Sequence, residues 1–276
     1  YIIEKLKAGI PIVQIKFSDE VNDVEIKENT FITDDIDFKG INSAIKCVRI
    51  KDTLFKMMLV KGDTFVMGAS LQEGGENEDE QVLHNVTLGS LYICETQVTQ
   101  KLWKTIMGNN PSKVKDDNNP VTNVSWYDCQ YFIKKLNDIT GMEFRLPTEA
   151  EWEFAAKGGQ KGKHNGYKYS GSNTITSIMW YSKNSENHPH EVSLKKSNEI
   201  GLYDMSGNIW EWCSDWYAPY DINPSFNPKG PLDGVDKICR GGSFLSEAKE
   251  CRVTIREKDS PNESSEDMGF RLVISA

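Results

Sequence analysis

Short apolar runs bounded by turn residues recur along the chain, and most have the length of a β-strand rather than a helix. These runs occupy residues 10–17, 47–50, 57–60, 64–68, 84–88, 91–94 and 210–216. Residues 61–63 (Lys-Gly-Asp) are a turn signal between two of them, so residues 57–68 are predicted to form a hairpin. Trp210, Trp212 and Trp216 predict that the last run is buried on one face and shielded on the other.

A helical period occurs in three places, each preceded by a residue suited to N-capping. Thr99 precedes the first, whose apolar positions are Leu102, Trp103, Ile106 and Met107. Ser125 and Asp128 approach a capping-box pattern before the second, with a predicted apolar stripe of Tyr127, Tyr131, Phe132 and Leu136. Thr148 precedes the third, which carries Glu149 and Glu151 in its first turn and ends at Gly158.

The segment from Cys239 to Val273 sustains neither period, so most of it is predicted to be loop. Gly241 and Gly242 predict a bend or a close backbone approach, because glycine accepts positive φ without steric cost. Phe270, Leu272 and Val273 predict a short strand that docks the C-terminus into the core. A long irregular loop held at both ends is a frequent place for function; the alternative is a surface return without a role.

Composition excludes several classes of function. A net charge of −9 leaves no basic face for nucleic acid, and no apolar run is long enough to span a bilayer. The six cysteines show no CxxC pair and are too scattered for a disulfide scaffold, so buried structural thiols are expected. The sequence begins at Tyr1, which is compatible with a removed leader or lipid anchor.

The first part of the chain differs from the rest. Residues 1–54 are rich in Ile, Val, Lys and Asp, have no Trp and carry no chemical signature. They are interpreted as an N-terminal extension or small β subdomain. Residues 55–276 form the main predicted domain.

Several segments carry short motifs in a fixed order. They are Phe65–Gly68, Val98–Thr99 with Trp103, Pro120–Val121 with Val124–Trp126, Arg145–Glu153, Gly201–Asn208 with Trp210–Trp212, Arg240–Ser243 and Gly269–Val273. Together they resemble the formylglycine-generating-enzyme (sulfatase-modifying factor) family over about residues 57–273. The resemblance implies an α+β fold of the C-type-lectin-like kind, with short strands, few helices and long irregular loops.

The family's enzymes use two cysteines after the Gly-Gly-Ser motif, which hold copper and oxidise a substrate cysteine. Soft sulfur ligands select Cu(I), and one thiol does not supply the pair. Here Ser246 stands at the first position and Cys251 at the second. The comparison therefore implies no copper and no enzymatic activity, with Cys251 a packed thiol. A three-histidine iron site, used by other enzymes of the fold, is not expected either, because the four histidines are scattered.

The same fold carries the variable proteins of diversity-generating retroelements, and the resemblance is strongest to their treponemal type. Their variable region lies at the C-terminus, which corresponds to about residues 240–273 here. Framework residues of that region are present, including Arg240–Ser243, Cys251, Arg252, Arg256 and Gly269–Val273. The resemblance implies that the ligand-binding, variable positions are Leu245, Ser246, Glu250, Ile255, Glu257, Asp259, Ser260, Glu263, Ser265, Glu266 and Asp267. Ile255 is expected to be exposed, because a recognition surface tolerates an exposed apolar side chain among polar neighbours.

The resemblance also implies a structural Ca²⁺ site near the Gly201-Leu-Tyr motif. Its ligands would be the Asp204 and Glu211 side chains and the Gly207 and Ile209 carbonyls, a set of hard oxygens suited to calcium. A hydrogen-bonded Asp and Glu without a metal is the alternative.

The sequence thus predicts a non-catalytic, receptor-like bacterial protein that presents a diversified C-terminal surface on a rigid scaffold. The alternative is a formylglycine-generating-type copper oxidase acting on protein cysteine. The acidic loop predicts a protein or surface ligand with basic or amide-rich patches, and a cell-surface or extracellular location.

Overall fold

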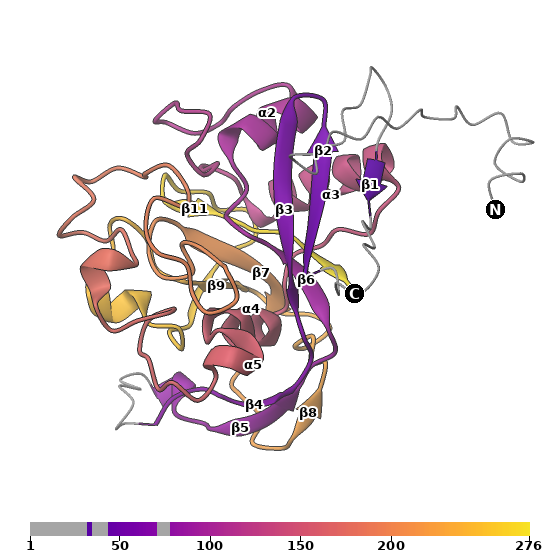
Figure 1. The fold of residues 1–276 in the computed structure, drawn as a ribbon. Coiled ribbons are helices and arrows are strands. Elements are labelled where there is room, and N and C mark those ends of the chain that lie inside the picture. Colours follow the sequence, from indigo (N-terminus) through magenta and orange to yellow (C-terminus); the bar gives the residue numbers. More distant parts are fainter. Residues whose placement is uncertain (1–31, 35–43, 71–77) are drawn as a thin grey trace, which may run out of the picture.

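The structure is a computed structural model that describes residues 32–34, 44–70 and 78–276. Its strands form three sheets around which long loops and short helices are arranged (Figure 1). The first sheet, in the order β1-β2-β3-β6-β12, is antiparallel throughout. Its strands are β1 (Ile32–Asp34), β2 (Ile45–Ile50), β3 (Thr53–Val60), β6 (Leu91–Cys94) and β12 (Val273–Ser275). Because β12 pairs with β6, the C-terminus returns to the sheet that the first described strands begin.

The other two sheets are smaller. One has the order β10-β9-β7-β11, with strands β7 (Trp210–Trp216), β9 (Lys237–Arg240), β10 (Glu257–Asp259) and β11 (Met268–Gly269). The other has the order β4-β5-β8, with strands β4 (Thr64–Met67), β5 (His84–Thr87) and β8 (Ser225–Phe226). The C-terminal segment therefore contributes strands to two sheets, including both edges of the four-stranded one.

The three predicted helices are confirmed, with the predicted caps. Thr99 caps α2 (Gln100–Met107), its hydroxyl accepting from the Leu102 N–H. Capping boxes begin α3 (Trp126–Thr140) at Ser125 and α4 (Glu149–Ala156) at Thr148. Short α5 (Gly159–Gly162) and the 3₁₀ turns η2 (Glu78–Glu80), η3 (Ile175–Ser177) and η4 (Ala248–Cys251) complete the described helices.

The predicted hairpin of residues 57–68 is wrong. β3 pairs with β6, whereas β4 pairs with β5 in another sheet. The two connections between these pairs lie against each other: the Gly62 N–H donates to Ser90 Oγ and the Leu88 N–H to the Asp63 carbonyl. A Cβ at Gly62 would meet the Leu88 carbonyl oxygen at 2.4 Å, so the turn residues permit a close chain crossing rather than a reversal.

The predicted apolar stripe of α3 is partly wrong. Phe132 and Leu136 are buried as expected, but Tyr127 and Tyr131 are exposed. Cys129 and Ile133 take their places on the buried face.

Helix α4 lies at the centre of the molecule, beneath β7 and β9 (Figure 1). All of its residues are buried, including the aromatic rings of Trp152 and Phe154 and the carboxylates of Glu149, Glu151 and Glu153. Buried carboxylates are stable only when cations or donors surround them. The helix therefore needs positively charged partners from other parts of the chain.

The region assigned to an N-terminal extension contributes β1 and β2 to the first sheet. The predicted strand at residues 47–50 is confirmed as part of β2. The predicted strand at residues 10–17 lies outside the described residues. The boundary at residue 54 stays a prediction.

Candidate functional site

The C-terminal segment, from Arg240 at the end of β9 onwards, is fastened to the molecule by four buried arginines. Each pairs with a buried carboxylate from an earlier part of the chain. The arginines are Arg240, Arg252, Arg256 and Arg271. Their charge-assisted bonds fix the backbone of the segment at its start, twice in its middle and at its end.

Arg240 and Arg256 supply two of the cations that α4 requires, beside Arg145 at Glu151 and Lys157 at Glu153. Arg240 donates to Glu149 at 3.1 Å, to Glu153 at 2.6 Å, to the Tyr220 hydroxyl at 3.1 Å, and to the Val253 and Ile255 carbonyls. All five guanidinium N–H groups of Arg240 thus have an acceptor. Arg256 forms a two-pronged pair with Glu149, at 2.7 and 2.9 Å. Although burial acts to raise the pKa of Glu153, Lys157 and Arg240 hold it below its usual value.

Arg252 and Arg271 form two further two-pronged pairs. Arg252 binds Glu80 at 2.7 and 2.9 Å, and Arg271 binds Glu211 at 2.6 and 2.7 Å. Glu80 lies 172 residues before Arg252, on η2. Sequence reasoning missed Glu80, because nothing local to an acidic loop distinguishes one buried carboxylate from its exposed neighbours.

The predicted ligand-binding positions differ widely in exposure. Leu245, Glu257 and Glu263 are exposed. Six others are half-buried: Glu250, Asp259, Ser260, Ser265, Glu266 and Asp267. Ser246 and Ile255 are buried.

The expectation that Ile255 is exposed is wrong, since only 6% of the residue is accessible. Its carbonyl accepts from Arg240 at 2.8 Å, which holds this part of the loop against the core and turns the side chain inwards. Ser246 is likewise turned inwards, where its hydroxyl accepts from the Ser243 N–H at 3.1 Å.

Ile255→Ser is expected to lower the free energy of unfolding by about 2–4 kcal/mol, because a buried side chain is truncated and a hydroxyl is buried in its place. Leu245→Ser is the matched control, because Leu245 is 43% exposed, and it is expected to cost less than about 1 kcal/mol. Urea unfolding of both variants measures the difference. Equal losses would contradict the assignment of one side chain to the core and the other to the surface.

The predicted positions form two groups at opposite edges of the four-stranded sheet. Ser265 and Asp267 precede β11, where the Ser265 hydroxyl and the Ser243 hydroxyl each donate to Asp267 at 2.7 Å. Ser243 also bonds the Leu245 N–H, so Leu245 belongs to this group. Glu257 and Asp259 lie on β10, at the other edge. Residues 260–267 run between the two edges.

Loops outside the C-terminal segment border the first group. The Ser182 N–H donates to the Ser246 carbonyl and the Asn123 N–H to the Ser265 carbonyl. Lys113 forms an ion pair with Glu266 at 2.8 Å. The surface around Leu245 therefore includes neighbouring loops whose positions were not predicted as part of it.

The thiol of Cys251 is enclosed. Its residue has no accessible surface, and a Cβ built on Gly242 would lie 2.6 Å from Sγ. Burial, with the nearby Glu250 carboxylate, raises the pKa of Cys251 to about 12. A thiol of this pKa is almost entirely protonated at neutral pH and is a poor nucleophile and metal ligand.

Two of the predicted calcium ligands, the Glu211 side chain and the Ile209 carbonyl, are bonded to groups of the chain itself. Both oxygens of Glu211 are occupied, by Arg271, by Trp152 Nε1 at 2.7 Å and by Gln97 Nε2 at 3.0 Å. Gln97 Nε2 also donates to the Ile209 carbonyl at 3.1 Å. Asp204 keeps one oxygen, Oδ1, without a hydrogen bond, and burial raises its pKa to about 6. These bonds engage Glu211 and Ile209 but leave Asp204 Oδ1 without a partner, so the calcium site stays a prediction.

No group of three or more His, Cys, Asp or Glu side chains suited to a metal occurs among the described residues. Two histidines do meet: the His188 and His190 rings lie 4.4 Å apart, and His190 stacks on Trp180 at 3.7 Å. Burial lowers the pKa of His190, which favours the neutral form of the ring.

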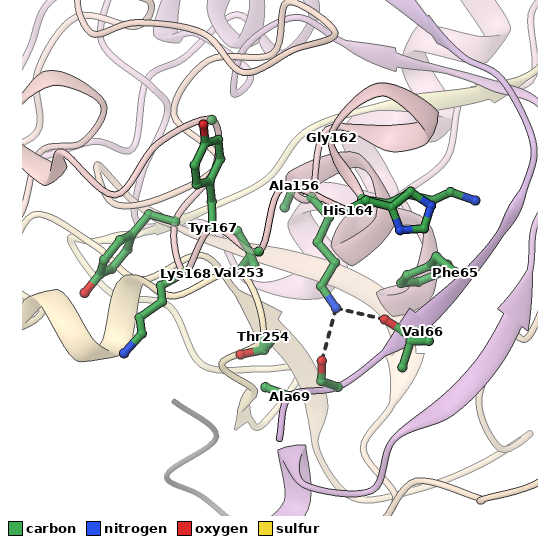
Figure 2. A pocket seen from close by; sticks show the side chains of 16 residues that line it. Phe65, Val66, Ala69, Ala156, Gly162, His164, Tyr167, Lys168, Val253 and Thr254 are labelled. Carbon is green, nitrogen blue, oxygen red and sulfur yellow. Dashed lines mark hydrogen bonds between the residues drawn. The ribbon is translucent and has the colours of Figure 1, made fainter. Parts of the chain in front are cut away.

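A hollow of about 320 Å³ lies between β4, α4 and the loop at residues 162–171 (Figure 2). Lysines line it, but two of their ammonium groups already have partners. Lys157 donates to the Val66 and Gly68 carbonyls, the dashed bonds in Figure 2, and pairs with Glu153. Lys163 pairs with Asp63 at 2.6 Å. These cations stabilise the wall of the hollow.

Comparison with known proteins gives consistent results. The model of the family described as the Sulfatase-modifying factor enzyme 1-like domain matches residues 48–276. The chain is 34% identical to a Chaperone protein LppX of Paenibacillus barcinonensis, covering 69% of this chain and 82% of that one. It is 29% identical to the Formylglycine-generating enzyme of Streptomyces coelicolor, covering 78% and 88%. The solved structure of Treponema denticola variable protein 1 matches with a TM-score of 0.77 and 32% identity, covering 84% and 99%.

These likenesses confirm the α+β, formylglycine-generating-enzyme type of fold and the predicted resemblance to variable proteins. The chain is similar both to enzymes and to a variable protein.

Proposed function

The chain belongs to the family of sulfatase-modifying factor enzyme 1-like domains, and we propose that within this family it is a non-catalytic ligand-binding protein with a diversified C-terminal surface. One observation carries the proposal: four buried arginine–carboxylate pairs hold the backbone of the C-terminal segment, while nine of the eleven predicted ligand-binding side chains are exposed or half-buried. The likeness to Treponema denticola variable protein 1 supports it.

A fastened backbone suits a surface whose side chains change. The framework arginines make their bonds to distant carboxylates and backbone carbonyls, and none of the exposed predicted positions takes part in those pairs. Exposed substitutions then have little effect on folding. Binding also loses little entropy, because the loop is already ordered before a ligand arrives.

The accessible side chains favour a ligand with basic or amide-rich groups. Glu247, Glu257 and Glu263 are exposed, and the chain carries a net charge of −9. Opposite charge on a protein partner would raise the association rate and exclude wrong partners. We propose a standard-sized protein interface and a location at the cell surface or outside the cell. No helix in the described part of the chain is long and apolar enough to cross a bilayer.

Randomising the exposed predicted positions is expected to change ligand choice while leaving stability nearly unchanged. A displayed library varied at Leu245, Glu257 and Glu263 should yield binders to new protein targets. Each single change should alter the free energy of unfolding by no more than about 0.5 kcal/mol. Melting temperatures of selected clones measure the second expectation. A library in which most clones fail to fold would contradict the proposal.

Natural diversification has a genomic signature. We expect a near-identical repeat of the coding sequence for about residues 240–273, rich in Asn codons, beside a reverse transcriptase gene. Natural variants should differ at the predicted positions and agree at the four arginines.

A copper oxidase of the formylglycine-generating type is the second candidate function. The similarity to the Formylglycine-generating enzyme of Streptomyces coelicolor favours it. The serine at position 246 and the enclosed thiol of Cys251 count against it.

A further inference from the structure

A second cavity lies under the proline-rich loop at residues 218–231, next to the start of β10, because Arg256 is part of its lining. Its volume is about 490 Å³, within the range of small-molecule sites. Met67 and Ala150 are buried in its lining, Trp216 and Tyr220 contribute aromatic rings, and the loop contributes prolines such as Pro219 and Pro228. None of the functions described above uses it.

One lining residue, Asp215, is a buried carboxylate with an unused oxygen. The residue is 5% exposed. Oδ2 accepts from the Glu149 N–H at 3.1 Å and from the Ser214 hydroxyl at 2.8 Å. Among the described residues, no donor reaches Oδ1. Asp215 lies where the pairing of β7 with β9 shifts register, between Trp212 and Trp216, and such bulges re-aim side chains.

The cations near Asp215 bond mainly to other groups, although Arg256, which also lines the cavity, keeps one buried guanidinium nitrogen, Nη1, without a hydrogen bond. Arg240 and Arg256 bind Glu149, and the Lys237 ammonium donates to the Ser214 carbonyl at 2.7 Å. Lys237 also lies over the rings of Trp126 and Trp216, at 4.1 and 3.7 Å. Burial and the neighbouring Glu149 raise the pKa of Asp215 to about 7, as expected for a carboxylate without a close counterion.

The loop approaches Asp215 closely at Gly230. This glycine has φ +68°, and a Cβ there would lie 3.3 Å from Asp215 Oδ1. The cavity next to that oxygen therefore remains open only because the residue above it lacks a side chain.

We propose that this cavity binds an organic cation, a primary ammonium or guanidinium on a short unbranched alkyl stem, with Asp215 Oδ1 accepting from the cationic group. A charge-assisted bond would give the buried carboxylate the partner it lacks. The prolines and aromatic rings would contact the methylenes of the stem, as apolar surfaces do with lysine and arginine side chains. A free amine and a basic side chain of a protein both present this chemistry.

The test is an NMR titration of the whole chain with n-butylammonium chloride, followed on the Met67 methyl and the Trp216 indole signals. Saturable shifts with a Kd on the order of 1 mM are expected for so small a ligand. Butyrate and n-butanol, at the same ionic strength, should give no saturable shift. Asp215→Asn should weaken n-butylammonium binding by about tenfold or more. Asp138→Asn, at an exposed acid outside the cavity, is the matched control and should leave binding unchanged.

If Asp215→Asn fails to fold, the preference of the wild-type protein for n-butylammonium over n-butanol and butyrate still tests the proposal. Binding of n-butanol as tight as that of n-butylammonium, or no saturation by n-butylammonium, would overturn the proposal. So would undiminished binding by a folded Asp215→Asn protein. A blocked Gly-Lys-Gly peptide distinguishes the source: tighter binding than n-butylammonium supports a protein side chain, and weaker binding supports a free amine.

Discussion

Arg240→Ala is expected to lower the free energy of unfolding by about 3–5 kcal/mol, the usual cost of removing one partner from a buried ion pair. Arg240 has no accessible surface, and its loss would leave Glu153 and Glu149 with fewer cations and two backbone carbonyls without donors. The carbonyls belong to Val253 and Ile255, so the middle of the C-terminal segment should loosen first.

Denaturant unfolding followed by circular dichroism measures this loss, and hydrogen exchange at residues 253–256 measures the local loosening. Lys134→Ala is the matched control, because it also removes a cation paired with a carboxylate. Lys134 and Asp138 are both exposed, so this variant should change stability by less than about 1 kcal/mol. A loss below about 1 kcal/mol for Arg240→Ala would show that the segment is not held as we describe.

Local signals in the sequence predicted the helices correctly. Ser125 with Asp128, and Thr148 with Glu151, form capping boxes within four residues of chain, so the pattern and the structure are the same set of contacts. The tryptophan-rich run was correctly predicted to be a strand, β7, for a similar reason, because its pattern of residues lies within seven consecutive positions. Contacts between residues that are close in the sequence can therefore be predicted without knowledge of the fold.

Errors arose where distant segments decide the outcome. The turn at residues 61–63 has the composition of a hairpin, but β6 and β5 pair with the strands on its two sides. Ile255 was predicted to be exposed because its neighbours in the chain are polar. Those neighbours include Arg252 and Arg256, whose guanidinium groups turn inwards to Glu80 and Glu149. In an irregular loop no period specifies direction, so burial follows from partners far away in sequence.

The candidate site was therefore predicted in outline only. The framework arginines were recognised as framework, but their carboxylate partners were not, since Glu80 and Arg252 meet across 172 residues. The partners of Glu211 show the same limit, because Gln97 and Arg271 reach this carboxylate from 114 and 60 residues away.

Cys251 in the folded protein is expected to react with iodoacetamide at pH 8 on the order of 1,000-fold more slowly than an exposed cysteine of ordinary pKa. The reason is the fraction of thiolate, because burial and Glu250 raise the pKa of this thiol to about 12. Enclosure by the backbone of Gly242 and Glu247 slows the reagent further. Mass spectrometry of the labelled peptide measures the rate, and the same protein in denaturant, where Cys251 should react at an ordinary rate, is the control.

The same property decides between the two candidate functions. A Cu(I) site of the oxidase kind needs two thiolates, whereas Ser246 supplies a hydroxyl that is already bound to the Ser243 N–H. Titration against a competing Cu(I) chelator is therefore expected to show no stoichiometric binding, in the wild type and in Cys251→Ala alike. Binding of one Cu(I) by the wild type that disappears in Cys251→Ala would favour the oxidase. Copper binding by Cys251 would also require its thiol to become accessible and deprotonated. The labelling rate of Cys251 measures that change directly, so the two experiments check each other.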